Sequence, residues 1–131
     1  MDQLSIGDKA PDFELLDLKG YKYLISDIYK TKNVLLVFNI GFAWPHCTNH
    51  MAQLRQDYSR FQQFNTDIMV LVPNGPKLIE KYTRTNDIPY TILSDKGSKI
   101  AAQFFQVKKF FAFGTPTVFL IDQTGKIIYT H

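Results

Sequence analysis

Short apolar runs rich in β-branched and aromatic residues alternate along the chain with segments of helical periodicity. Five such runs predict β-strands, at residues 34–40, 67–72, 90–94, 117–122 and 126–130. The first, second and fourth runs are apolar nearly throughout, which is typical of strands that helices cover on both faces of a sheet.

Helical periodicity appears in the segments between these strands. Met51, Leu54, Tyr58 and Phe61 follow one another at spacings of three and four, so they form the apolar stripe of an amphipathic helix that starts near Thr48. Further helices are predicted over residues 76–85, where a proline suits the first helical position, and over residues 98–105.

The order of these elements predicts an α/β domain with a mixed sheet. The stretch IDQTGKII predicts two antiparallel strands joined by a tight turn. Ahead of the first strand, GDKAPDFELLDLKGYKYLISD is expected to be a short extended lead-in that turns at Gly20. We expect one domain over residues 1–131, because this length is near the commonest size of a single domain.

Composition and charge narrow the class of function. A formal net charge of +3, spread along the chain, is too weak to predict nucleic-acid binding. The apolar run Val34 to Phe38 is too short to span a bilayer, and the N-terminus shows no signal-peptide pattern. One cysteine cannot form an intramolecular disulfide, which indicates a reducing compartment. Together these features predict a protein that is soluble, cytoplasmic and free of contact with a membrane.

Cys47, that single cysteine, is the candidate nucleophile. It follows an apolar strand and Pro45, and it falls in the first turn of the predicted helix, where free N–H groups and the helix dipole lower the pKa of a thiol. His50, three residues on, projects from the same helical face and is able to donate a hydrogen bond to the thiolate. The sequence therefore predicts a Cys47 thiol that is ionised near neutral pH.

Four segments in order resemble a known family: GDKAPDFEL, NVLLVFNIGFAWPHCTNHMAQLRQDYSRF, IPYTILSDKGSKIAAQFF and GTPTVFLIDQTGKIIY. They are similar to the thioredoxin-fold peroxiredoxins of the alkyl hydroperoxide reductase and thiol-specific antioxidant group, above all the bacterioferritin comigratory branch. The resemblance implies a thioredoxin-like fold, with a central mixed sheet flanked by helices on both faces.

The same resemblance implies the chemistry of the site. Cys47 would be the peroxidatic nucleophile of a one-Cys enzyme that reduces hydrogen peroxide or alkyl hydroperoxides. An external thiol, from a small molecule or a thioredoxin-like protein, would reduce the oxidised cysteine. The resemblance implies no metal, flavin or nucleotide cofactor, and it carries dimerisation as a family expectation.

The chain departs from the family pattern around Cys47. The expected proline and threonine fall on Ile40 and Trp44, and the arginine that precedes the later strand falls on Pro116. Thr115 and Pro116 instead resemble a thioredoxin element in which the proline is cis, so we predict a cis bond between them.

These residues give the expected site. Its pocket is predicted to be shaped around Cys47 by Trp44, Pro45, His50, Thr115 and Pro116, with Trp44 as the wall that narrows access to the thiol.

Two other classes of function remain open at this point. The first is a thioredoxin-fold domain that binds partners and has lost its chemistry, which the missing proline, threonine and arginine favour. The second is a copper or zinc site formed by Cys47 and His50, with His46 beside them, because sulfur and imidazole are suitable ligands for both metals.

Overall fold

The secondary structure follows the predicted order. The structure, a computed structural model, describes residues 3–17, 19–41, 45–105 and 116–131, with the backbone alone at Pro45 and His46. Its elements are β1 (Glu14–Leu16), β2 (Lys22–Leu24), α1 (Ile25–Tyr29), β3 (Asn33–Phe38), α2 (Pro45–Gln63), β4 (Thr66–Val72), α3 (Pro76–Asn86), β5 (Thr91–Ser94), the short 3-10 helix η1 (Lys96–Ser98), α4 (Ala101–Phe104), β6 (Thr117–Ile121) and β7 (Ile127–Thr130).

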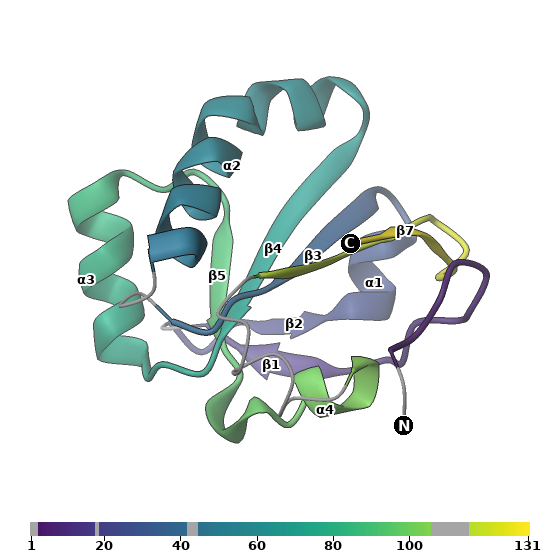
Figure 1. Ribbon diagram of the computed structural model, residues 1–131, viewed down its shortest axis with the longest axis horizontal. Coiled ribbons are helices and arrows are strands. Elements are labelled where there is room, and N and C mark those ends of the chain that lie inside the picture. The colour runs from purple at the N-terminus through teal and green to yellow at the C-terminus, as the bar shows by residue number, and fades with distance from the viewer. Residues whose placement is uncertain (1–2, 18, 42–44, 106–115) are drawn as a thin grey trace.

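A five-stranded mixed sheet forms the centre of the fold (Figure 1). The strand order is β5-β4-β3-β6-β7, in which β3, β4 and β5 run parallel to one another and β6 and β7 are antiparallel to their neighbours. The predicted hairpin at residues 117–130 is confirmed, because β6 pairs directly with β7.

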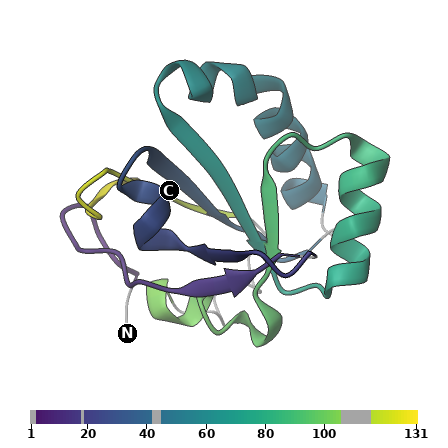
Figure 2. The same ribbon diagram turned by 180° about the vertical axis from the view of Figure 1, so that it is seen from behind.

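Helices cover both faces of this sheet, as predicted. Alternate residues of β3 face opposite ways, so Leu36 and Phe38 pack toward α1 and α4, whereas Leu35 and Val37 pack toward α2 and α3. The predicted stripe on α2 packs on the second face through Met51 and Leu54, with Tyr58 and Phe61 partly buried beside them. Figure 2 shows the same layers from behind.

The lead-in contains more structure than the sequence predicted. β1 and β2 form a separate two-stranded antiparallel sheet, and Gly20 between them has a φ of +84°, which suits the predicted turn. Helix α1 follows and was not predicted. Asp12 stabilises its first turn, because the Asp12 carboxylate accepts hydrogen bonds from the backbone N–H (3.1 Å) and hydroxyl (2.7 Å) of Ser26.

The third predicted helix, residues 98–105, is interrupted. Residues Lys96 to Ser98 form η1, in which Gly97 has a φ of +75°, and only Ala101 to Phe104 are α-helical. The buried Asp95 carboxylate fixes this corner by accepting the N–H groups of Ile100 and Ala101, both at 2.9 Å. Its satisfied oxygens explain how a carboxylate is buried at this point.

The loops that leave β3 and β4 lie at one end of the sheet, because these strands are parallel neighbours. Helix α2 begins after β3 and helix α3 begins after β4, so both helix starts lie near this end (Figure 1). Open α/β sheets usually bind ligands at the carboxyl ends of their parallel strands. None of the described helices combines the length and the apolar content that a membrane crossing requires.

Candidate active site

Cys47 lies in the first turn of α2, where the sequence placed it, and its side chain is fully buried with 0% exposure. It belongs to the hydrophobic cluster on the α1 and α4 side of the sheet, together with Phe38 and Ile40. A thiol that packs among these residues is shielded from water, so Cys47 packs in part like a small apolar side chain.

Asn39 connects the end of β3 to the start of α2. Its side chain is 1% exposed and makes two hydrogen bonds: Nδ2 donates to the carbonyl oxygen of Cys47 at 3.3 Å, and Oδ1 accepts the N–H of Gly41 at 2.9 Å. Its backbone N–H donates to the Leu71 carbonyl oxygen at 2.9 Å. Asn39 therefore holds the strand, the loop that follows it and the first turn of the helix together.

Gly41 occupies a position that only glycine fits easily. Its φ is +133°, and a Cβ atom at this residue would lie 3.1 Å from the Oδ1 atom of Asn74, in the loop between β4 and α3. The missing side chain therefore allows this loop to approach closely. The backbone N–H groups of Ile40 and Gly41 also lie near the Cys47 sulfur, where they favour its thiolate form.

Burial raises the pKa of Cys47, and the N–H groups of Ile40 and Gly41 oppose this rise only in part. The predicted ionisation near neutral pH was therefore wrong for this conformation. The physical reason is that removal of the sulfur from water outweighs the donors around it. Those donors come from the loop after β3, whereas the sequence predicted them from the first turn of the helix.

His50 lies one turn beyond Cys47 on α2, as predicted, and is half-buried. Its Nδ1 atom is buried without a hydrogen-bond partner. Burial lowers the pKa of His50, and the charge of His131 lowers it further. The imidazole is therefore neutral at pH 7, so it is able to accept a proton.

His131 is a neighbour of the site that sequence reasoning left apart from Cys47. Its backbone pairs with Val118 through two hydrogen bonds of 3.1 and 3.2 Å, and residues directly opposite each other in an antiparallel pair share a face. Val118 packs on the face that α2 covers. This register brings the His131 imidazole within electrostatic reach of His50.

The other predicted site residues are only partly described. Trp44 and Thr115 lie outside the described residues, so the predicted wall at Trp44 and the predicted cis bond at Thr115–Pro116 are untested. Pro116 is half-buried directly before β6, and Pro45 is the first residue of α2.

Arg55, two turns beyond Cys47 on α2, contacts the end of helix α3. Its Nη1 atom donates to the carbonyl oxygen of Asn86 at 2.9 Å, so this hydrogen bond stabilises the C-terminal end of α3. Within the described part of the chain, no three His, Cys, Asp or Glu side chains are grouped so that they could hold a metal ion. The side chain of His46, part of the alternative metal site, is not described.

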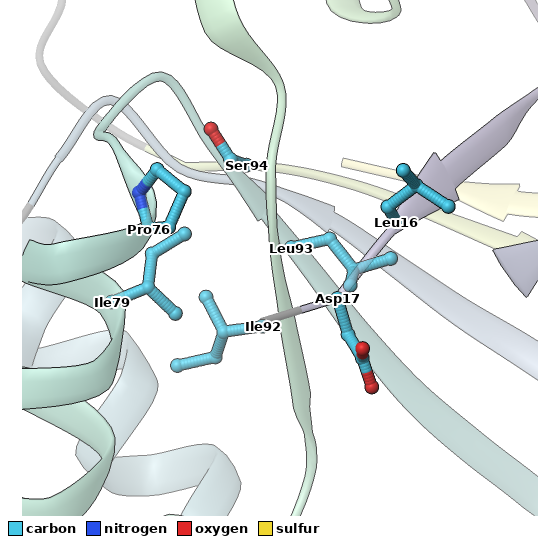
Figure 3. Close-up of a pocket in the computed structure, with 7 residues that line it drawn as sticks. All are labelled: Leu16, Asp17, Pro76, Ile79, Ile92, Leu93 and Ser94. Atoms are coloured by element: carbon cyan, nitrogen blue, oxygen red, sulfur yellow. The ribbon is translucent and has the colours of Figure 1, made fainter. Parts of the chain in front are cut away.

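The described cavities lie away from Cys47. A small one, of about 20 Å³, lies between the start of α3, β5 and the end of β1, and Pro76, Ser94 and Leu16 line it (Figure 3). A larger hollow of about 370 Å³ lies beside it, next to the β1–β2 hairpin. Neither has Cys47 or His50 in its lining, so the candidate chemistry is separate from both.

Comparison with known proteins supports the predicted fold. The structure of the peroxidoxin BcpB from Mycobacterium tuberculosis superposes with a TM-score of 0.84 at 23% identity, over 98% of this chain and 86% of that one. The fold is therefore thioredoxin-like, as predicted.

Sequence comparison then gives the family. The model of the AhpC/TSA family matches residues 6–130, so the chain belongs to the AhpC/TSA family. The peroxiredoxin Bcp of Bacillus subtilis is 30% identical over 95% of this chain and 83% of its own length. The thiol-disulfide oxidoreductase ResA of Geobacillus thermodenitrificans is 31% identical over 95% of this chain and 67% of its own length.

The pH dependence of thiol labelling tests the direction of the Cys47 pKa. With methyl methanethiosulfonate, which reacts with thiolate, the labelling rate should reach half its maximum at a higher pH in the folded protein than in the same chain unfolded in urea. The Cys47→Ser variant should not be labelled. A half-maximum at lower pH in the folded protein would show that local N–H donors outweigh burial.

Proposed function

We propose that this protein is a thiol-dependent peroxidase that reduces hydrogen peroxide or alkyl hydroperoxides through Cys47. The observation that carries the proposal is the position of the sulfur, which lies in the first turn of α2 and near the backbone N–H groups of Ile40 and Gly41 in the loop after β3. Membership of the AhpC/TSA family and the likeness to peroxiredoxin Bcp support the same chemistry.

The reaction begins from a neutral pair, because burial favours the neutral thiol at Cys47 and the neutral imidazole at His50. As the sulfur attacks the terminal peroxide oxygen, a sulfur–oxygen bond forms, the oxygen–oxygen bond breaks and His50 accepts the thiol proton. His50 then returns this proton to the departing oxygen. The products are a sulfenic acid at Cys47 and water or an alcohol, so the cysteine loses the two electrons that the peroxide gains.

The reductant comes from outside the chain. Cys47 is the only cysteine in the 131 residues, so an internal disulfide cannot form. A small thiol or a thioredoxin-like protein attacks the sulfenic acid, releases water and forms a mixed disulfide, and a second external thiol releases Cys47. This cycle requires a reducing compartment, for which we propose the cytoplasm.

One observation favours a second candidate function. The complete burial of Cys47 and its raised pKa are what a structural cysteine would show in a domain that binds partners without chemistry. The two functions differ in one property, namely whether low concentrations of peroxide oxidise the sulfur.

Intact-mass spectrometry with graded hydrogen peroxide distinguishes the two functions. Near-stoichiometric peroxide should add the mass of one oxygen to the wild-type protein, and a reducing thiol should remove it. The Cys47→Ser variant should gain no such mass. If the wild-type protein stays unmodified even in large excess of peroxide, the peroxidase function is wrong and the binding domain is favoured.

Substitution of His50 by glutamine tests the proton transfer. At pH 7 the variant should be oxidised about a hundredfold more slowly, because a general base typically contributes about 10²–10⁴ in rate. The difference should shrink as the pH rises toward the raised pKa of Cys47, because the thiolate then forms without a base.

A matched control separates this role from a general disturbance of α2. Asn49 is the exposed neighbour of His50, so Asn49→Gln should be oxidised at the wild-type rate. A loss in His50→Gln that is equal at every pH would contradict the proton transfer and assign His50 a structural role.

A further inference from the structure

Two buried side-chain atoms in the described part of the chain lack a hydrogen-bond partner: Nδ1 of His50 and Oδ1 of Asn74. Buried polar atoms nearly always have partners, so each such exception needs a physical explanation. Asn74 contacts the loop after β3 at Gly41, and His50 lies one turn beyond Cys47 on α2, so both atoms belong to residues close to the candidate site.

Asn74 contacts this loop at the residue that also contacts the sulfur. Its Oδ1 atom lies 3.1 Å from where a Cβ atom of Gly41 would be, and the N–H of Gly41 is near enough to the sulfur of Cys47 to favour its thiolate form. The loop that carries Asn74 is anchored, because the Ser94 hydroxyl donates to the Asn74 carbonyl oxygen at 2.7 Å. Ser94, on β5, and Pro76, which follows this loop at the start of α3, are both labelled in Figure 3.

The chemistry of the unpaired oxygen defines its missing partner. An amide oxygen only accepts hydrogen bonds, so the partner must bring an O–H or N–H donor. A hydroperoxide carries an O–H on its terminal oxygen, which is the atom that a thiol attacks. In a disulfide, the alternative partner in thiol exchange, the sulfur atoms that a thiol attacks carry no such donor.

The geometry points to Asn74 as a substrate-binding residue whose Oδ1 atom accepts the O–H of a hydroperoxide beside Cys47, an inference that rests on the peroxidase function proposed above. This hydrogen bond orients the terminal oxygen toward the sulfur while the proton stays on that oxygen in the product sulfenic acid. At the other end of the oxygen–oxygen bond, Nδ1 of His50 returns its proton to the leaving oxygen. Asn74 Oδ1 and His50 Nδ1 thus each gain a hydrogen-bond partner from the substrate. Orientation of this kind makes a bimolecular attack effectively intramolecular.

The Asn74→Leu variant tests this inference, because leucine keeps the approximate size of the side chain and removes the acceptor. The rate of Cys47 oxidation by hydrogen peroxide should fall about three- to tenfold, the range expected for one lost hydrogen bond. The rate of labelling by methyl methanethiosulfonate, which carries no hydrogen-bond donor, should stay within about twofold of the wild-type rate.

Labelling by methyl methanethiosulfonate shows whether the variant keeps its fold. The Asn74→Ala variant repeats both rate measurements with a smaller side chain. Asn49→Leu is the matched control on the exposed face of α2 and should change neither rate. The inference is overturned if both reactions of the Asn74 variants change together, or if neither changes. A wild-type protein that hydrogen peroxide does not oxidise would instead overturn the peroxidase function itself, and the role of Asn74 with it.

Discussion

The two hydrogen bonds of the Asn39 side chain determine where the Cys47 sulfur lies. They join the end of β3 to Gly41 on one side and to the Cys47 carbonyl oxygen on the other, within a fully buried setting. Because a buried amide would lose these bonds if Asn39 or Gly41 moved, they favour the observed position of both residues. The contact of Ile40 and Gly41 with the sulfur depends on this constraint, and so does the approach of Asn74.

Burial and hydrogen bonding act in opposite directions on the chemistry of this site. The removal of Cys47 from water raises its pKa, whereas the two loop N–H groups favour the thiolate. Burial of His50 itself and the charge of His131 lower the pKa of the imidazole, which keeps it neutral at pH 7. In the proposed reaction the thiol therefore keeps its proton until a substrate arrives, and bond formation and proton transfer occur together.

Features that depend on local periodicity could be predicted from the sequence, whereas contacts that depend on the pairing of strands in the sheet could not. The stripe that begins at Met51 and the buried strands repeat at fixed spacings, so they could be recognised directly. Helix α1 is only five residues long and offers too little periodicity. Asn74 and His131 reach the site only through the strand register and the loop after β4, which no local pattern encodes. The direction of the Cys47 pKa was predicted wrongly for the same reason, because burial is a tertiary effect.

The loop amides of Ile40 and Gly41, rather than those of the first helical turn, are the groups that favour the thiolate form of Cys47. A pH titration of the backbone amide signals by ¹H–¹⁵N NMR measures this directly. The signals of Ile40 and Gly41 should shift together with the ionisation of Cys47 and stay constant in Cys47→Ser. The account would be contradicted if these two signals did not respond while those of Thr48 and Asn49 followed the thiol.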